Sequence, residues 1–108
     1  MLNDSLALDR AFGALSDPVR RGMLARLSLG PASVSELARP LSISLPAVMQ
    51  HLRALETSGL VASEKRGRVR TVRLEGRTLA EAEGWLSRRR QEWEARLNRF
   101  EDHLNDIK

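Results

Sequence analysis

Two short helical patterns, separated by only a few residues, constrain the fold of this chain more than any other feature of its sequence. The first is predicted over residues 34–39, because Ser33-Val34-Ser35-Glu36 matches a capping box and Pro40 ends the pattern. The second begins after Ser44, a good N-cap residue, and ends at Gly59, which suits the left-handed cap position. The residues between Pro40 and Ser44 are too few for an element, so we expect a tight turn between two helices.

Two more helices are predicted before this pair. Apolar residues recur at helical spacing over residues 5–15. Asp17-Pro18 then supplies a cap and a first helical residue for a second helix, which Gly30-Pro31 ends.

A hairpin and a long helix are predicted after the pair. Residues 60–74 have the pattern of two short strands about a turn at Gly67. Thr78-Leu79-Ala80-Glu81 matches a second capping box, which we expect to open a dimerisation helix over about residues 78–105. The order of four helices, two strands and a helix is that of a mainly helical winged helix-turn-helix, in a single domain over residues 1–108.

The composition is typical of a soluble globular domain. The chain has 108 residues, of which 42% are hydrophobic and 30% charged. It has no cysteine, which excludes disulfides, thiolate metal sites and a cysteine nucleophile. No apolar run approaches about 18 residues, and the first ten residues lack a basic segment. We therefore expect neither a membrane span nor a secretory signal, and a cytoplasmic location with no membrane partner.

The positive charge of the chain is concentrated in one segment. The formal net charge is +4. Residues 61–77 alone hold six basic and two acidic residues, so this segment accounts for the whole excess. Charge focused in this way predicts a polyanionic partner, and double-stranded DNA fits the hairpin that carries it.

The last helix is too long for its own domain to cover. From Leu79 to Leu104 it would extend roughly 39 Å, whereas the preceding residues would form a body with a radius of gyration on the order of 11 Å. Its apolar stripe would then face water in a monomer, so we expect a homodimer. The alternative is a helix that folds back on its own core. The predicted interface also draws on Leu2 and Leu6 of the first helix, and its main residues are Leu6, Leu86, Trp93, Leu97, Phe100 and Leu104.

The helix predicted after Ser44 has a small, almost uncharged outer face. At 100° per residue its inner stripe consists of Leu45, Val48, Leu52 and Leu55. Gln50 points nearly the opposite way, with Pro46 and Ala47 on either side. We expect these three to read base edges, because Gln50 suits an adenine edge and small apolar groups suit a thymine methyl. The alternative is a solvated helix that happens to be small on its outside.

Six side chains are predicted to contact phosphate. Ser44 offers a hydroxyl and a backbone N–H at a helix N-terminus, and Arg53 lies further along the same helix. His51, on the flank, is either a phosphate donor or a half-buried packing residue. Three guanidinium groups meet at the hairpin tip, where the alternative is a solvated turn, and they belong to Arg66, Arg68 and Arg70.

The residues offer little for metal binding or catalysis. The chain has only two histidines, and the one metal arrangement left open joins Glu81 and Glu83 to His103 of the partner subunit. There is no glycine-rich phosphate loop and no Ser/His/Asp set that can be placed together, so we expect no enzyme, no metal and no cofactor. The alternative to a sequence-specific DNA-binding repressor is a winged-helix module that binds a protein partner without reading DNA.

Several segments together resemble the ArsR-type bacterial repressors. Residues 14–24 (ALSDPVRRGML) are similar to the second-helix signature of that family, and residues 35–38 (SELA) to its third helix. Residues 45–56 (LPAVMQHLRALE), with Gly59-Leu60-Val61, are similar to its recognition helix, and Gly67-Arg68 to its wing turn. The likeness covers nearly the whole chain.

This resemblance implies a homodimer that binds an inverted-repeat operator and represses transcription. It implies DNA contacts from Ser44, Pro46, Ala47, Gln50 and His51. Residue 49 is often Ser in the family and is Met here, which favours packing over a polar contact. The metal-sensing cysteines and the paired Asp/His set of many relatives are absent. The chain therefore resembles the cysteine-free branch, and no small-molecule or metal effector is assigned.

Overall fold

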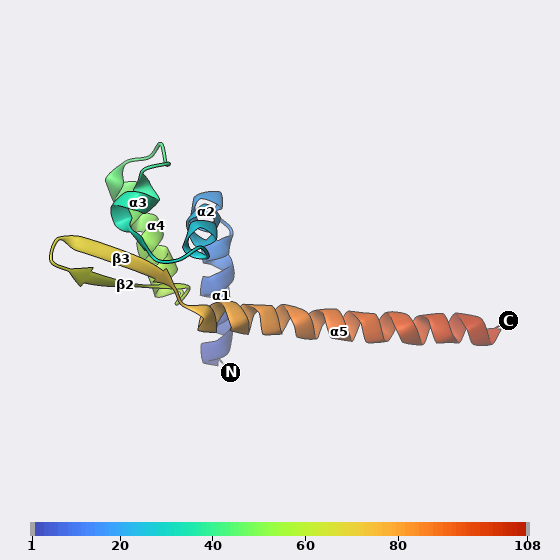
Figure 1. Ribbon diagram of the computed structural model, residues 1–108. Coiled ribbons are helices and arrows are strands. Elements are labelled where there is room, and N and C mark those ends of the chain that lie inside the picture. The colour runs from blue at the N-terminus through green and yellow to red at the C-terminus, as the bar shows by residue number, and fades with distance from the viewer. Residues whose placement is uncertain (1, 108) are drawn as a thin grey trace.

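The computed structural model describes residues 2–107, with side chains from Ser5 onward, and contains five helices and three strands within that range. The side chain of Leu2, expected at the dimer interface, lies outside the described side chains. Along the chain the elements are α1 (Leu2–Leu15), α2 (Pro18–Leu27), β1 (Ala32–Ser33), α3 (Val34–Ala38), α4 (Leu45–Thr57), β2 (Val61–Arg66), β3 (Val69–Leu74) and α5 (Gly76–Ile107) (Figure 1).

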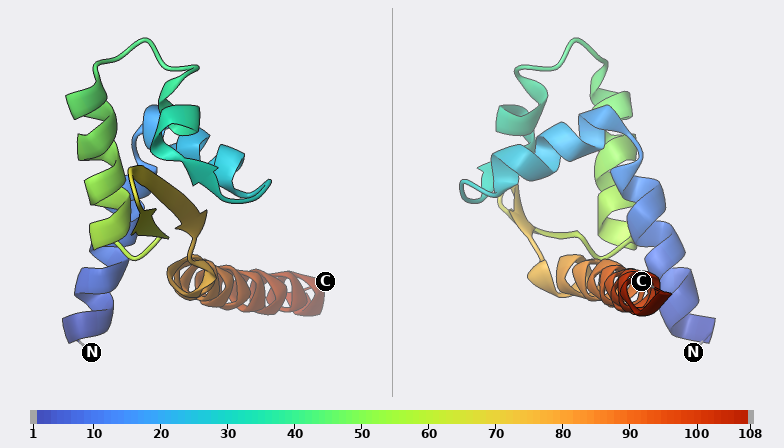
Figure 2. Two further views of the ribbon diagram at one scale, coloured as in Figure 1. Left: turned by 60° about the vertical axis from the view of Figure 1, so that its left-hand side comes forward. Right: turned by 90° about the vertical axis from the view of Figure 1, so that its right-hand side faces the viewer.

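The molecule is a small body with one long helix leaving it. The elements from α1 to β3 pack together, and α5 runs away from them (Figures 1 and 2). The β2–β3 hairpin, which we call the wing, projects on the side opposite the free end of α5. The principal extents of 71 × 30 × 21 Å reflect this shape.

Local capping signals fix the starts of three helices as predicted. The Asp17 carboxylate accepts hydrogen bonds from the backbone N–H groups of Val19 at 2.8 Å and Arg20 at 3.1 Å. Ser33 and Glu36 form a complete capping box at the start of α3. The Ser44 hydroxyl accepts a hydrogen bond from the backbone N–H of Ala47, in the first turn of α4, at 3.3 Å. Each cap satisfies a helix donor that would otherwise lack a partner.

The sheet has three antiparallel strands, one more than predicted. Its order is β1-β3-β2, and β3 pairs with β2 over the full length of both strands. The additional strand, β1, has only two residues, and Ala32 pairs with Val72. Two residues are too few to produce an alternating pattern, so no periodic signal could predict this strand. The predicted order of elements is corrected accordingly.

The core lies where α2, α4 and the sheet meet. Its largest fully buried side chains are Val48, Leu55, Leu60 and Val72. Leu45 was expected on the inner stripe of α4, and that expectation is wrong, because its side chain is 59% exposed. Its helical angle matches that of the buried stripe, but Leu45 is the first residue of α4, and at that end of the helix the side chain lies beyond the core.

The start of α5 also differs from the prediction. The helix begins at Gly76, and the capping box predicted at Thr78 does not form. Glu81 instead pairs with Arg77 at 3.5 Å, one turn earlier in the helix. Thr78 packs over the turn after α4, where a Cβ on Gly59 would lie 2.6 Å from its hydroxyl oxygen. This tertiary contact is invisible in the local sequence.

Only the first third of α5 packs against the body. Trp85 meets Phe12 of α1 edge to face, with ring centroids 6.0 Å apart, and the Arg89 guanidinium lies 4.9 Å from the centre of the Trp85 ring. Residues 88–107 are exposed throughout, so the alternative in which this helix folds back on its own core is wrong. No helix within residues 2–107 is both long and apolar enough to span a membrane.

Candidate nucleic-acid interface

The N-terminal half of α4 and the wing lie on the same side of the body. α3, the turn over residues 39–44 and α4 form the helix-turn-helix, and we call α4 the reading helix. A hollow of about 370 Å³ separates the start of the reading helix from the wing, and we call it the wing hollow. Its lining comes from the β1–α3 junction, the reading helix and the wing: Ser33, Val34, Ser35, Leu45, Met49, Lys65, Arg68, Val69 and Arg70.

The reading helix presents the predicted neutral face to solvent. Pro46 and Gln50 are exposed and Ala47 is half-buried, while the opposite stripe of Val48, Leu52 and Leu55 is buried. The first charged side chain along the helix is Arg53, in its third turn. A face without long charged side chains allows backbone and short side chains to approach base edges. These are the three residues for which base contacts were predicted.

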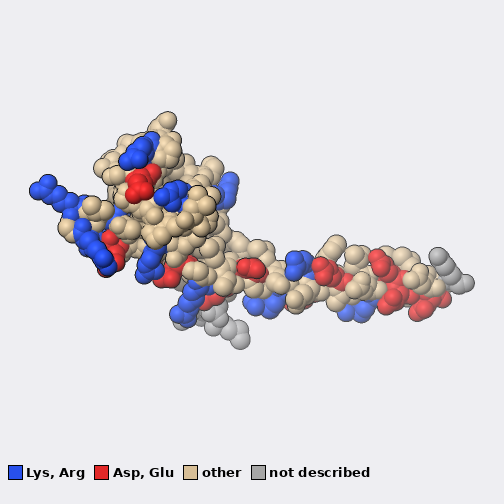
Figure 3. Space-filling model, viewed as in Figure 1, with Lys and Arg blue, Asp and Glu red and all other residues tan. Residues whose placement is uncertain are grey.

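The wing carries cations beyond the edge of the core. Residues 64–71 are all exposed, and Gly67 makes the turn with φ of +63°. Figure 3 shows basic side chains gathered at this end of the molecule, whereas both charge signs alternate along α5. Arg66 lies 3.5 Å from Glu64, and Arg70 donates to the Ser63 hydroxyl at 2.9 Å. Among residues 5–107, Lys65 and Arg68 have no acidic partner.

His51 lies in a polar cluster at the flank of the reading helix. Arg20 donates to the carbonyl oxygens of Ala14 at 2.8 Å and Gly13 at 3.2 Å, and its Nη1 lies 3.3 Å from His51 Nδ1. A guanidinium cannot accept, so Nδ1 accepts this bond and the neutral ring carries its proton on Nε2. The side chain of His51 is 20% exposed. The ring is thus half-buried and still has one N–H left to donate.

Asp17 belongs to the same cluster. Its Oδ1 lies 3.9 Å from His51 Nδ1. The backbone N–H of Arg20 holds the pKa of the Asp17 carboxyl below its ordinary value, against the desolvation that raises it, and the N–H of Val19 and the charge of Arg20 lower it further. The Asp17 carboxylate therefore caps α2 and also lies beside His51 on the flank of the reading helix.

Arg10 was not predicted as a site residue. It lies on α1, yet it lines an open hollow of about 380 Å³ together with Gln50 and Arg53 of the reading helix. The packing of α1 on α4 brings these cations together across more than 40 residues of sequence. No local pattern signals this arrangement, because it depends on how two helices cross.

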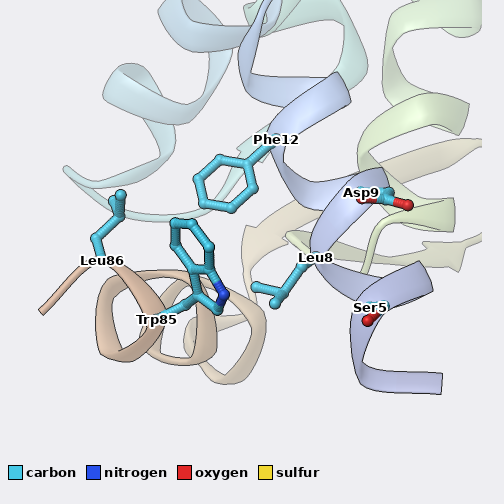
Figure 4. Close-up of a pocket in the computed structure, with 6 residues that line it drawn as sticks. All are labelled: Ser5, Leu8, Asp9, Phe12, Trp85 and Leu86. Carbon is cyan, nitrogen blue, oxygen red and sulfur yellow. The ribbon is translucent and has the colours of Figure 1, made fainter. Parts of the chain in front are cut away.

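The face predicted to form a dimer interface is exposed in the single chain. The exposed fractions are 63% for Trp93, 58% for Phe100 and 39% for Leu97. Leu6, Leu86 and Leu104 are also exposed. A pocket of about 450 Å³ opens between α1 and α5 at the Phe12–Trp85 contact, and Leu86 lies on its wall (Figure 4). We call the side chains of Leu86, Trp93, Leu97, Phe100 and Leu104 the α5 stripe.

A helix-turn-helix followed by a cationic wing defines a winged helix-turn-helix DNA-binding protein. The family model described as a helix-turn-helix domain matches residues 15–64 of this chain. The HTH-type transcriptional regulator Rv2034 of Mycobacterium tuberculosis is 47% identical over 72 residues, which are 67% of each chain. The transcriptional repressor SdpR of Bacillus subtilis is 27% identical over 79 residues, covering 73% of this chain and 88% of SdpR.

Solved structures agree with these relatives. The crystal structure of an ArsR family transcriptional regulator is 46% identical, with a TM-score of 0.81, and the match covers 83% of this chain and 93% of that one. An ArsR-like transcriptional regulator from Rhodococcus sp. RHA1 is 33% identical, with a TM-score of 0.85 over 100% of this chain and 99% of that chain. The chain belongs to the ArsR family and is a DNA-binding transcriptional regulator, which confirms the resemblance seen in its sequence.

Proposed function

We propose that this chain is a homodimeric repressor that binds an inverted-repeat operator, with one reading helix in each half-site. The observation that carries the proposal is the neutral outer face of α4 beside a wing whose Lys65 and Arg68 have no acidic partner among the described residues. The neutral face suits base edges, and the free cations suit the phosphates that flank them.

The proposed contacts divide into two groups. Pro46, Ala47 and Gln50 read base edges in the major groove. The phosphate contacts hold the protein on the duplex without selecting a sequence. For His51, the N–H on Nε2 is the proposed donor, because Nδ1 is occupied by Arg20. The proposed phosphate contacts are Ser44, His51, Arg53, Arg66, Arg68 and Arg70.

Dimerisation is proposed through the α5 stripe and Leu6. Burying an aromatic or leucine side chain of this kind stabilises an interface by roughly 1.5–3 kcal/mol. The pocket at Phe12 and Trp85 shares Leu86 with the stripe, so one apolar surface continues from α1 along α5. A twofold axis would let two copies cover this surface mutually. In this proposal residues 1–108 act as one unit, with α5 as its dimerisation helix.

The regulatory sign and the absence of catalysis are part of the same proposal. SdpR, a relative over most of its length, is a transcriptional repressor, which supports repression here. Relatives that are transcriptional regulators support a non-enzymatic role without a cofactor. Binding chromosomal DNA would place the protein in the compartment that holds that DNA, in line with the expected cytoplasmic location.

Selection of bound sequences from random duplex DNA tests this function. We expect an imperfect inverted repeat whose half-sites lie about one helical turn, or ~34 Å, apart. With roughly six phosphate contacts, affinity should fall about a thousandfold between 50 and 200 mM salt. If no duplex is retained at low salt, the proposal fails and the protein-binding winged-helix module becomes the better reading.

A further inference from the structure

An apolar surface lies in the wing hollow, beside the Arg68 and Arg70 side chains that were expected to contact phosphate. Leu45 and Val69 are 59% and 53% exposed, and Met49 lies one turn after Leu45 on the reading helix, half-buried against the core. A single exposed leucine is ordinary on a protein surface. Here, however, two exposed apolar side chains and a methionine line one concavity, and it lies inside the proposed DNA interface.

The surroundings of this surface indicate what covers it. Three cations line the same hollow, namely Lys65, Arg68 and Arg70. An apolar protein partner would not need this charge, whereas a nucleic acid duplex combines phosphates with apolar groups on its bases. Leu45 is also the first residue of the reading helix, and the N-terminal residues of such helices contact base edges in the major groove.

We propose that Leu45 packs against the 5-methyl group of a thymine in each half-site and so helps to determine the operator sequence. Thymine is the one DNA base with a methyl group in the major groove. Leucine has no side-chain donor or acceptor, so it selects this base by burying its methyl and not by hydrogen bonding. Met49 supports Leu45 from the core side. This inference rests on the proposed DNA-binding function.

Methyl deletion from the DNA tests the proposal directly. The duplex obtained by selection is rebuilt with deoxyuridine in place of each thymine in turn, which removes one methyl group and leaves the base pairing intact. For the unchanged protein we expect at least one position per half-site at which affinity falls about fourfold. Changing that position in both half-sites should lower affinity by about fifteenfold.

Two leucine variants identify the side chain responsible. Leu45→Ala should bind the thymine duplex more weakly than the unchanged protein and should bind the thymine and deoxyuridine duplexes equally. Because the Leu45 side chain is exposed, the thermal unfolding of this variant should match that of the unchanged protein. Leu29→Ala is the matched control, since Leu29 is 84% exposed in the turn after α2 and outside the wing hollow. This control should retain the full difference between the two duplexes.

The possible results distinguish a failure of the Leu45 proposal from a failure of the proposed DNA-binding function. A protein that binds its selected duplex but is indifferent to every deoxyuridine substitution overturns the role of Leu45 and leaves the proposed function standing. A Leu45→Ala variant that keeps the thymine preference overturns it as well, and assigns the methyl contact to another residue. If no duplex is selected at all, both proposals fall together.

Discussion

Side chains that read bases and side chains that hold phosphates respond differently when they are truncated. Gln50 is proposed for the first group and Arg68 for the second, and both residues are exposed. The loss of a base contact affects only sequences that contain the base, whereas the loss of a phosphate contact affects every duplex. Each assignment therefore predicts its own pattern of loss.

Gln50→Ala should relax the sequence preference at one position of each half-site by roughly 1–3 kcal/mol, because the bidentate contact to a base edge is lost. Arg68→Ala should weaken binding to all sequences about equally and reduce the salt dependence by about one phosphate. Titrations of both variants against the selected duplex and its single-position changes distinguish the two. Identical patterns for the two variants would show that the division of roles is wrong.

The Asp17 carboxylate predicts a dependence of stability on pH. Its pKa is lowered from the ordinary value of 3.8 in the folded chain, chiefly by the backbone N–H of Arg20. A lowered folded pKa means that the ionised carboxylate stabilises the fold above the unfolded value, and that this contribution is lost as pH falls through the folded value. Asp17→Asn retains a cap acceptor but does not titrate.

The stability advantage of the unchanged protein over Asp17→Asn should therefore shrink as pH falls below about 4. Denaturant unfolding at a series of pH values measures it. The Glu36 carboxylate, whose pKa is also lowered, titrates in both proteins and cancels in the comparison. An advantage that grows with acidification would contradict the capping role of the charge.

At the scale of elements, the sequence predicted what short-range chemistry determines. Asp17, Ser33 and Ser44 cap the helices assigned to them, because each cap involves residues within one turn. The prediction for Leu45 was wrong, because a helical angle does not show whether the core extends to that end of the helix. The prediction for Thr78 was wrong, because its side chain packs against the turn at Gly59 and does not form a capping box. The clustering of Arg10 with the reading helix likewise needs the crossing of two helices.

The turn between α4 and β2 predicts a stability difference between two glycines. Both Gly59 and Gly67 have positive φ, which costs an alanine roughly 1–2 kcal/mol. A Cβ on Gly59 would also meet the Thr78 hydroxyl at 2.6 Å, whereas nothing lies within 4 Å of one on Gly67. Gly59→Ala should therefore destabilise the fold by about 2–4 kcal/mol, and Gly67→Ala only by the backbone cost.

A double variant isolates the steric part of this difference. With Thr78→Ala in the background, Gly59→Ala should cost about as much free energy of unfolding as Gly67→Ala does in the unchanged protein. Chemical denaturation of the unchanged protein, the three single variants and the double variant measures these values. If the cost at Gly59 is the same with and without the Thr78 hydroxyl, the contact between α5 and this turn contributes nothing.

At the scale of the whole molecule, the exposed α5 stripe predicts a dimer that one charge can disrupt. Trp93→Glu places a carboxylate in each copy's apolar surface, so association should weaken at least about a hundredfold. Sedimentation at micromolar concentration should then give a monomer with unchanged helix content. Gln91→Glu is the control, because it adds the same charge on the opposite face of α5 and should leave the dimer intact.

In the proposed dimer, the free length of α5 would also affect the spacing between the two half-sites of the operator. Residues 88–107 extend about 30 Å beyond the body, away from the wing. If two copies cross along these arms, rotating the crossing by one degree displaces a point 30 Å away by about half an ångström. Small changes in the packing of the two α5 helices, far from the DNA, would then change the distance between the two reading helices. Relatives with the same reading residues could therefore bind operators whose half-sites lie at different spacings.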